Sequence, residues 1–257
     1  MAEAVAGPGD PGGGVLLTVA VNGGTSRDKH AGVPVTPDEL AAEAREVARA
    51  GARAIHVHPR GLAEEQSLAP GDVLPAVAAI RAATGLPVGV TTGIWTVEGD
   101  TARRLELVAG WTGPDKPDFA SINVNEPGID DLAVLLVEDL GIAVEAGVWT
   151  VDDVDLLASS ALATRAFQVL LEPTSTEPAT AVAVASQASA ALIARGITVP
   201  QVHHGYDLAT WEVIRWAVRA GFGIRIGLED TTVLPDGTTA PGNGALATAA
   251  MHLAAEA

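Results

Sequence analysis

Short apolar runs rich in β-branched residues alternate with longer amphipathic segments along this chain from residue 14 to its end. Apolar runs of about four to eight residues are typical of buried strands, and longer segments with apolar residues at helical spacing are typical of helices. Eight strand-then-helix units follow one another. We therefore expect strands at residues 15–21, 53–58, 87–92, 117–123, 142–148, 167–172, 197–204 and 223–229.

Local signals mark where two of the helices should begin. Thr36 has the position of an N-cap, with Pro37 at the first helical position and Glu39 three residues after the cap. This arrangement predicts a capping box and a helix that runs to about residue 50. A later helix is expected to begin with Asp207 as its cap and to be anchored by three apolar residues: Leu208, Trp211 and Ile214.

Eight uninterrupted units predict a closed parallel (β/α)8 barrel, a TIM barrel, as a single domain over residues 14–257. A doubly wound open sheet is the alternative, but it usually has fewer strands at this length, and the glycine-rich stretches contain no dinucleotide or Walker motif. Residues 1–13 are expected to form a flexible tail. They lack the features of a signal peptide, and no apolar run could cross a bilayer, so a cytoplasmic protein is expected.

Composition narrows the choice of partners. The formal net charge is -17, from 15 basic and 32 acidic residues, and such a surface repels nucleic acid and anionic membranes. An anionic substrate would therefore need a local positive centre, such as a metal ion or an arginine. The chain has no cysteine, so a metal could be held only by histidine, carboxylate and backbone oxygen ligands.

Polar or ionisable residues stand where each expected strand ends, which is where barrel enzymes place their active sites. Part of this pattern is ordinary, because strands end where polar loops begin. The pattern nevertheless favours a convergent polar pocket. The residues concerned are Asn22, His56, His58, Thr91, Thr92, Asn123, Glu145, Glu172, His203, His204, Glu229 and Asp230.

His56 and His58 are the most specific feature among them. Residues two apart on a strand point to the same face, so both imidazoles can be directed into the mouth of the barrel. Two imidazoles on one face are suitable ligands for zinc or another borderline divalent ion. The alternative is a pair of hydrogen-bonded histidines in a polar core, but the position at the carboxyl end of a strand favours the metal.

The segment RIGLED at residues 225–230 is the second candidate. The same alternation places Arg225 and Glu229 on one face of the eighth expected strand. In a closed ring this strand lies next to the first. Glu229 could then be a third metal ligand, and Arg225 could orient a carboxylate such as that of Asp230 and keep it ionised. A structural ion pair within the barrel explains this segment equally well.

Two motifs give the sequence a family resemblance: HVHPR after the second expected strand and RIGLED at the eighth. Together with AVNGG, the TPDELAAEAREVARAGA helix, VTTG, SIN and APGNGAL, they resemble the β-keto acid cleavage enzymes, the family of 3-keto-5-aminohexanoate cleavage enzyme. The resemblance extends in order over nearly the whole chain. It implies a zinc-dependent (β/α)8 barrel that converts a β-keto acid and acetyl-CoA into acetoacetate and a new acyl-CoA.

Carried over to the matching positions, the resemblance makes His56, His58 and Glu229 the ligands of zinc or another divalent transition metal. It makes Asp230 the general base and Arg225 its partner. It also implies acetyl-CoA as co-substrate and a homotetramer. The substrate pocket would be lined by Asn22, Thr25, Thr91, Thr92, Gly93, Ser121 and Asn123.

The chain also departs from this family. Thr25 stands where members that act on the aminated substrate carry an acidic residue, and Gly61 stands where an aspartate is common. The fifth expected strand lacks the usual pair of an aromatic and an acidic residue, and the chain is short for the family. We therefore expect a β-keto acid with an uncharged or anionic tail as the substrate.

Two other functions remain open. Metal hydrolases of the amidohydrolase type also use an HxH motif, but normally after the first strand, with further histidines on the fifth and sixth. Those strands end here in Glu145 and Glu172, and only one of His203 and His204 can face inward. The second alternative is a family member that binds a metal or ligand without turnover, which would not need a base such as Asp230.

Overall fold

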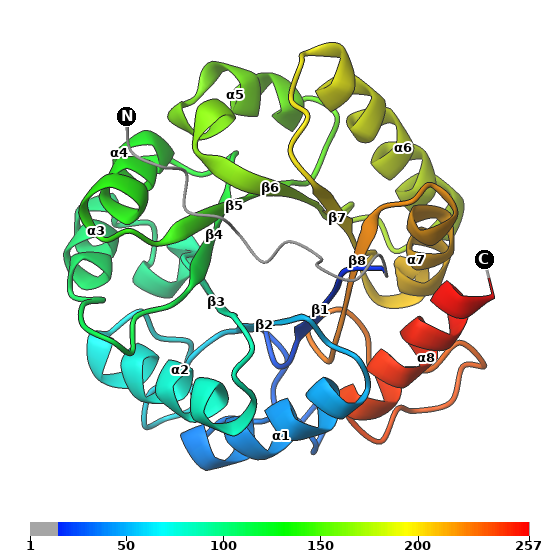
Figure 1. Cartoon of the computed structure of the whole chain (residues 1–257), viewed down its shortest axis with the longest axis horizontal. Coiled ribbons are helices and arrows are strands. Elements are labelled where there is room, and N and C mark those ends of the chain that lie inside the picture. The colour runs from blue at the N-terminus through cyan, green and yellow to red at the C-terminus, as the bar shows by residue number, and fades with distance from the viewer. Residues whose placement is uncertain (1–14, 257) are drawn as a thin grey trace.

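The eight strands form a closed parallel barrel in sequence order, in which β1 pairs with both β2 and β8. The computed structural model describes residues 15–256, so the expected tail at residues 1–13 lies outside the described part. The predicted (β/α)8 barrel is confirmed (Figure 1). The strands are β1 (Leu17–Ala20), β2 (Ala54–Val57), β3 (Val88–Thr91), β4 (Phe119–Asn123), β5 (Ala143–Val148), β6 (Ala166–Leu171), β7 (Gln201–His203) and β8 (Gly223–Ile226).

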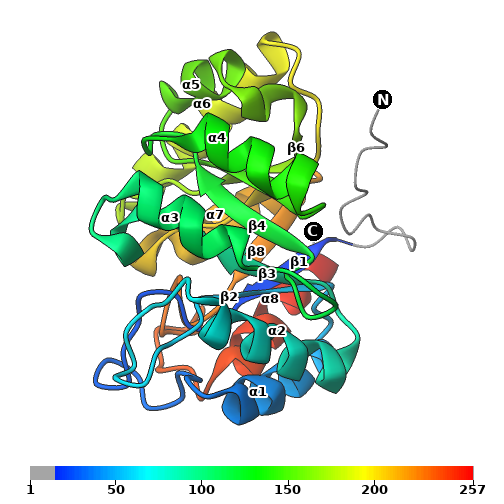
Figure 2. The same ribbon diagram turned by 90° about the vertical axis from the view of Figure 1, so that its left-hand side faces the viewer.

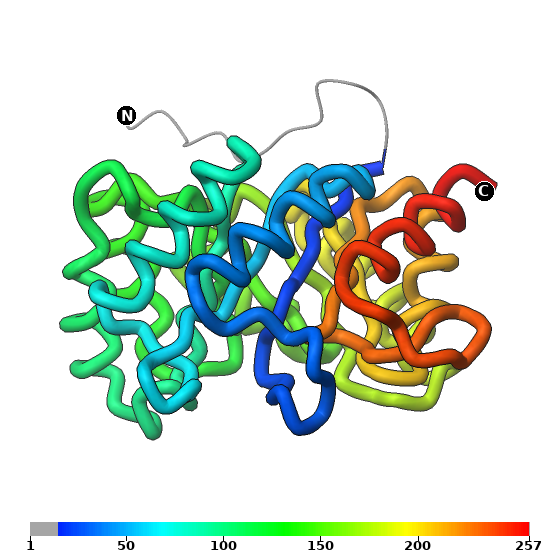
Figure 3. The backbone as a smooth tube through the Cα atoms, turned by 90° about the horizontal axis from the view of Figure 1, so that it is seen from below, coloured from blue at the N-terminus to red at the C-terminus, as the bar shows by residue number. Residues whose placement is uncertain are grey.

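The helices surround this barrel, as the view from the side also shows (Figure 2). The last helix packs beside the first, which closes the outer ring (Figure 3). No helix in the described part of the chain is long and apolar enough to span a membrane. The helices are α1 (Pro37–Arg49), α2 (Pro70–Thr84), α3 (Thr101–Ala109), α4 (Ile129–Val134), α5 (Asp153–Ser159), α6 (Pro178–Ala194), α7 (Thr210–Arg219) and α8 (Asn243–Ala255).

Aromatic side chains close the amino-terminal end of the barrel. Phe119 and Phe167 meet edge to face with their ring centroids 5.7 Å apart, and Phe119 packs with Ala54 and Ala143. Gly89 leaves room for this cluster, because a Cβ there would lie 2.2 Å from the ring of Phe119. Because these side chains fill the amino-terminal end of the barrel, its open end lies at the carboxyl ends of the strands.

Most strands are shorter than their expected ranges, and the shortening of β7 and β8 affects the site. β8 ends at Ile226, and the following residues form a turn in which the backbone N–H groups of Asp230 and Thr231 donate to the carbonyl oxygen of Gly227 at 2.9 and 3.0 Å. The alternation of faces expected through Glu229 therefore stops at Ile226. β7 covers only residues 201–203, and it follows Pro200, which has no N–H group to extend the strand.

The capping box predicted for the first helix is confirmed. The Thr36 hydroxyl accepts from the N–H of Glu39, and the Glu39 carboxylate accepts from the N–H of Thr36. The prediction that Asp207 caps a helix is wrong. Its N–H donates to the carbonyl oxygen of Asp230 at 2.7 Å, it has a φ of 50°, and α7 begins at Thr210.

The apolar anchors expected for that helix are correct only in part. Trp211 and Ile214 are buried, but Leu208 is 68% exposed, because it lies in the turn before α7. The hydrogen bond of Asp207 ties this turn to the segment after β8. The turn thus forms part of the wall at the open end of the barrel.

Candidate active site

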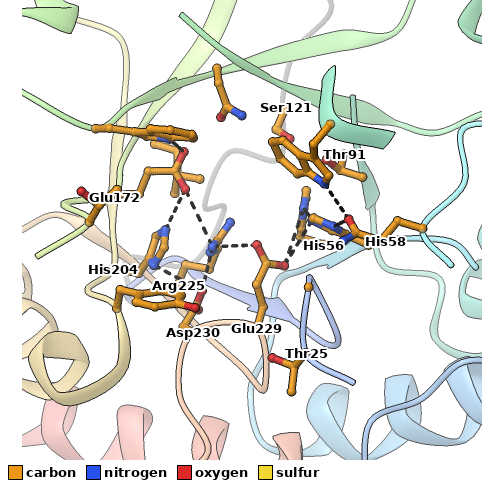
Figure 4. Close-up of a pocket in the computed structure, with 18 of the residues that line it drawn as sticks. Thr25, His56, His58, Thr91, Ser121, Glu172, His204, Arg225, Glu229 and Asp230 are labelled. Atoms are coloured by element: carbon orange, nitrogen blue, oxygen red, sulfur yellow. Dashed lines mark hydrogen bonds and ion pairs between the residues drawn. The ribbon is translucent and has the colours of Figure 1, made fainter. Parts of the chain in front are cut away.

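A cavity of about 500 Å³ lies at the carboxyl ends of the strands. Figure 4 shows side chains from β2, β3, β4 and β8, and from the residues that directly follow β6 and β7, converging on it. Most of the residues that the sequence singles out as site residues line this cavity. They are Thr25, His56, His58, Thr91, Ser121, Asn123, Arg225, Glu229 and Asp230.

Three of these side chains are close enough to share one metal ion. The Nε2 atoms of His56 and His58 are 3.1 Å apart, and the Oε2 atom of Glu229 lies 3.9 and 3.4 Å from them. One ligand atom from each side chain falls within 4.8 Å of the others. Both histidines are buried, and the Glu229 side chain is largely so.

The protonation of these groups suits a metal ion. Burial lowers the pKa of His56 to about 3, so its imidazole is neutral. Burial acts to raise the pKa of Glu229, but the positive charge of Arg225 holds it below its ordinary range, so the carboxylate is ionised. The Glu229 Oε2 atom is buried and has no hydrogen-bond partner among the described residues. Two imidazole nitrogen atoms and one ionised carboxylate are a donor set that zinc binds in proteins.

Hydrogen bonds fix the orientation of His58. Its Nδ1 lies 2.6 Å from the Oε1 atom of Gln66, and an amide oxygen only accepts, so Nδ1 carries the proton and Nε2 is free for a metal. The His58 backbone is held by the Asn22 side chain, which accepts from its N–H and donates to its carbonyl oxygen, each at 2.9 Å. The ring of Trp95 stacks on His58 at 6.2 Å between centroids.

Asp230 lies beside this group with one oxygen atom held and the other free. The Nη2 atom of Arg225 donates to Asp230 Oδ1 at 2.7 Å and to Glu229 Oε1 at 3.0 Å. Asp230 Oδ2 is buried without a hydrogen-bond partner in the described structure. Burial raises the pKa of Asp230 above its ordinary value, although Arg225 opposes this rise. An unpartnered carboxylate oxygen with a raised pKa can act as a proton acceptor.

Three residues that the sequence predicts to line the pocket are buried next to it and are not among the residues that line it. Asn22 orients His58, and the Thr92 hydroxyl donates to the Ser121 carbonyl oxygen at 2.5 Å. Gly93 is confined, because a Cβ there would lie 2.2 Å from the ring of Trp95. These three residues position the pocket side chains and do not themselves line the pocket.

The sequence does not predict several of the residues that line the pocket, or it predicts no role for them. Glu172 and His204 were recognised only as strand ends, yet they form an ion pair with each other at 3.2 Å inside the pocket. Other missed residues come from loops, whose conformation a hydrophobic pattern does not predict. These are Gly24, Lys29, Gln66, Trp95, Trp149, Pro173, Thr174 and Tyr206, with Leu170 from β6.

His203 at the end of β7 and His204 directly after it face opposite ways, as the alternation of a strand predicts. His203 packs outside the barrel against Trp216 and Phe222, with ring centroids at 5.0 and 4.7 Å. His204 lines the pocket, where it contacts Glu172 and Asp230. His203 therefore cannot supply the additional inward ligand that the amidohydrolase alternative would need.

Solved structures share the barrel fold. Apo ObcA superposes with a TM-score of 0.69 at 18% sequence identity, covering 86% of this chain and 61% of that chain. ObcA in a binary complex with oxaloacetate gives 0.70 at 18% identity, covering 86% and 63%. 3-Dehydroquinate dehydratase from Geobacillus kaustophilus HTA426 gives 0.58 at 15% identity, covering 94% and 90%. The chain thus spans about three fifths of the ObcA length, and these identities show the fold alone.

A search of curated protein sequences gives no significant match. The family model described as beta-keto acid cleavage enzyme matches residues 14–257. The match includes His56, His58 and the Arg225–Asp230 segment, which the structure brings together. The chain therefore belongs to the beta-keto acid cleavage enzyme family.

Proposed function

We propose that this protein is a zinc-dependent β-keto acid cleavage enzyme that uses acetyl-CoA as co-substrate and releases acetoacetate and a new acyl-CoA. One structural observation supports this function in addition to the family membership. A histidine, histidine and glutamate group that can hold a metal lies directly beside Asp230, which has a free buried oxygen atom. This pairing joins a Lewis acid site to a base in one cavity.

His56, His58 and Glu229 would hold the metal, and the donor set also suits other divalent transition metals. Zinc, when bound, would polarise the keto and carboxylate oxygens of the substrate and stabilise the negative charge that develops between them. Arg225 keeps Glu229 ionised for this purpose through its contact with Glu229 Oε1 at 3.0 Å.

Asp230 is the proposed general base. Its free Oδ2 atom would take a proton from the carbon between the keto and carboxylate groups, while Arg225 holds Oδ1 at 2.7 Å. The raised pKa makes this carboxylate a stronger base than an exposed aspartate. The arginine fixes its direction and limits the rise of its pKa.

The remaining steps exchange acyl groups. The substrate carbanion attacks the acetyl carbonyl carbon of acetyl-CoA, which forms a carbon–carbon bond and releases the CoA thiolate. The thiolate then attacks the original keto carbon, and the bond between that carbon and the substrate methylene carbon breaks. The new acyl-CoA leaves, and the proton held on Asp230 returns to the acetoacetate carbanion.

Solved complexes of ObcA support the two proposed classes of ligand, which are a β-keto acid and a CoA derivative. Structures of that protein contain oxaloacetate, which is a β-keto acid, and a C4-CoA adduct with oxalate. The cavity of about 500 Å³ is large enough for a small keto acid. We also propose a homotetramer, which light scattering of the purified protein would test.

The tail of the substrate should be uncharged or anionic. Thr25 lines the cavity, and its hydroxyl already donates to the carbonyl oxygen of Leu228 at 2.7 Å. A neutral side chain at this place provides no counter-charge for an ammonium group. Steady-state kinetics with a panel of β-keto acids should therefore rank the aminated acid below neutral and dicarboxylic acids; an aminated acid as the best substrate would contradict this.

The same panel tests the function itself. Purified protein is first analysed for metal and then assayed for acyl-CoA formation from acetyl-CoA and each β-keto acid. We expect bound zinc and at least one acid that gives both acetoacetate and a new acyl-CoA. Bound metal without any CoA-dependent product would favour a binding protein, and breakdown of the acid without acetyl-CoA would favour a hydrolase.

A further inference from the structure

A chain of contacts links Asp230 to the far side of the pocket. His204 Nδ1 lies 3.2 Å from Asp230 Oδ1, and His204 Nε2 lies 3.2 Å from Glu172 Oε2. Glu172 follows β6, His204 follows β7 and Asp230 follows β8, so three neighbouring strand ends supply the three groups (Figure 4). All three line the cavity.

The surroundings of His204 determine where its protons lie. Nδ1 is 2.9 Å from the carbonyl oxygen of Gly205, which can only accept, so Nδ1 must donate. Nε2 faces the carboxylate of Glu172, which is also an acceptor when ionised. The Glu172 carboxylate is itself fixed by the indole N–H of Trp149, which donates to Oε1 at 2.7 Å. The imidazole is thus held at both nitrogen atoms between two fixed acceptors.

Arg225 and His204 contact the same oxygen atom of Asp230. Arg225 Nη2 lies 2.7 Å from Oδ1, and His204 Nδ1 lies 3.2 Å from it. Oδ2 has no partner in the part of the chain that is described. Two contacts from different directions restrict rotation of the carboxylate more than one contact can. They also leave Oδ2 as the carboxylate oxygen without a hydrogen-bond partner among the described residues.

We propose that His204 is a positioning residue for Asp230, and that Glu172 and Trp149 hold the imidazole in place. The inference rests on the proposed function, in which Asp230 is the base. Its consequence is specific: loss of the contact at Nδ1 should impair turnover, because Asp230 Oδ2 is no longer held in its productive direction. Metal binding should persist, because His204 does not belong to the His56, His58 and Glu229 group.

The two nitrogen atoms of His204 can be tested separately. In His204→Asn the amide nitrogen replaces Nδ1 and can still reach Asp230, whereas in His204→Gln it replaces Nε2 and can reach only Glu172. Each variant, loaded with zinc, is assayed for kcat and KM with the best acid of the panel and acetyl-CoA. Zinc content and melting temperature are measured on the same samples.

We expect His204→Gln to lose about 10- to 100-fold in kcat, the usual effect of removing an orienting contact, with KM and zinc content little changed. His204→Asn should recover much of this loss. His203→Gln is the matched control, because His203 is equally buried but packs outside the barrel. It should keep the wild-type kcat even if its melting temperature falls.

Equal kcat values for His204→Gln and the wild type would overturn the inference. So would equal losses in the Asn and Gln variants that follow their melting temperatures, since these would indicate only a structural role. If both variants fail to fold, Glu172→Gln decides: we expect a lower kcat at unchanged zinc content, and a wild-type kcat would overturn the inference. A wild-type protein that turns over no β-keto acid would instead refute the proposed function.

Discussion

Glu229 can reach the metal group because the residue facing it has no side chain. Gly23 has a φ of 52°, and a Cβ there would lie 2.1 Å from the Cγ atom of Glu229. β8 has already ended at Ile226, so the turn and this close approach direct Glu229 inward. Glycine at position 23 is therefore required by the site as well as by the backbone.

Gly23→Ala should displace Glu229 and weaken metal binding by at least about tenfold, as losses at a ligand or its supporting contacts do. The metal dissociation constant, measured by competition with a chelator, checks this. Gly24→Ala is the matched control, because a Cβ at Gly24 would lie 3.7 Å from its nearest neighbour, the Nε2 atom of Gln66, and its φ is ordinary. Equal affinity of Gly23→Ala and the wild type would show that Glu229 is not a ligand.

Gln66 fixes the protonation of His58. Its Oε1 atom accepts from His58 Nδ1 at 2.6 Å and from Trp95 Nε1 at 3.0 Å. Gln66→Ala should lower metal affinity about 10- to 100-fold, because either ring nitrogen of His58 could then carry the proton. Trp95→Phe keeps a stacked ring but loses the N–H donor, so it should bind metal as the wild type does. A Gln66→Ala protein with undiminished affinity in the same chelator competition would contradict this.

Among the elements, α1 has the clearest local determinant of stability. The Glu39 carboxylate accepts from the N–H groups of Val35 and Thr36, each at 3.0 Å, and from Arg27 at 2.7 Å. Burial acts to raise the pKa of Glu39, but these hydrogen bonds and the charge of Arg27 lower it to about 2. A carboxylate whose pKa is lowered by folding stabilises the fold above its unfolded pKa and loses this effect as the pH falls.

Glu39→Gln should therefore be less stable than the wild type near neutral pH, by at most about 1 kcal/mol for a side chain this exposed. The difference in free energy of unfolding should shrink as the pH falls below 4.5, the ordinary pKa of glutamate, toward 2. Urea denaturation at a series of pH values measures it. A difference that stays constant or grows on acidification would refute the capping role of the ionised carboxylate.

The elements also show how much a sequence can predict. Periodicity and turn signals predict eight units and the cap of α1, because these depend on residues near one another in the chain. HVHPR and RIGLED contain the three side chains that the structure brings close enough together to hold a metal ion. The Glu172 and His204 contact was not predicted, since it depends on the pairing of β6 with β7. Asp207 was misassigned because its N–H bonds to a residue 23 positions away, Asp230.

At the scale of the whole molecule, one closed ring of strands carries all the candidate groups. The metal group joins β2 to the segment after β8, and these lie on either side of β1. A bound metal would therefore crosslink parts of the chain that are far apart in sequence. Ligands that bind only the folded state stabilise it, by about 2.7 kcal/mol at a concentration 100 times the dissociation constant.

Excess zinc should consequently raise the melting temperature of the metal-free protein, as differential scanning calorimetry would show. His56→Ala should respond much less, because it retains only two of the three ligands. Equal shifts in the two proteins would mean that zinc stabilises the barrel from another site.

The central claim is that Asp230 is the base of a metal-dependent acyl exchange. It is tested most directly by comparing acyl-CoA formation by the zinc-loaded wild type and by Asp230→Asn, with zinc content measured in both. The amide keeps the size of the side chain but cannot accept the substrate proton. We predict equal zinc content and a loss of at least about 100-fold in kcat, the typical contribution of a general base. Equal rates in the two proteins would contradict the account.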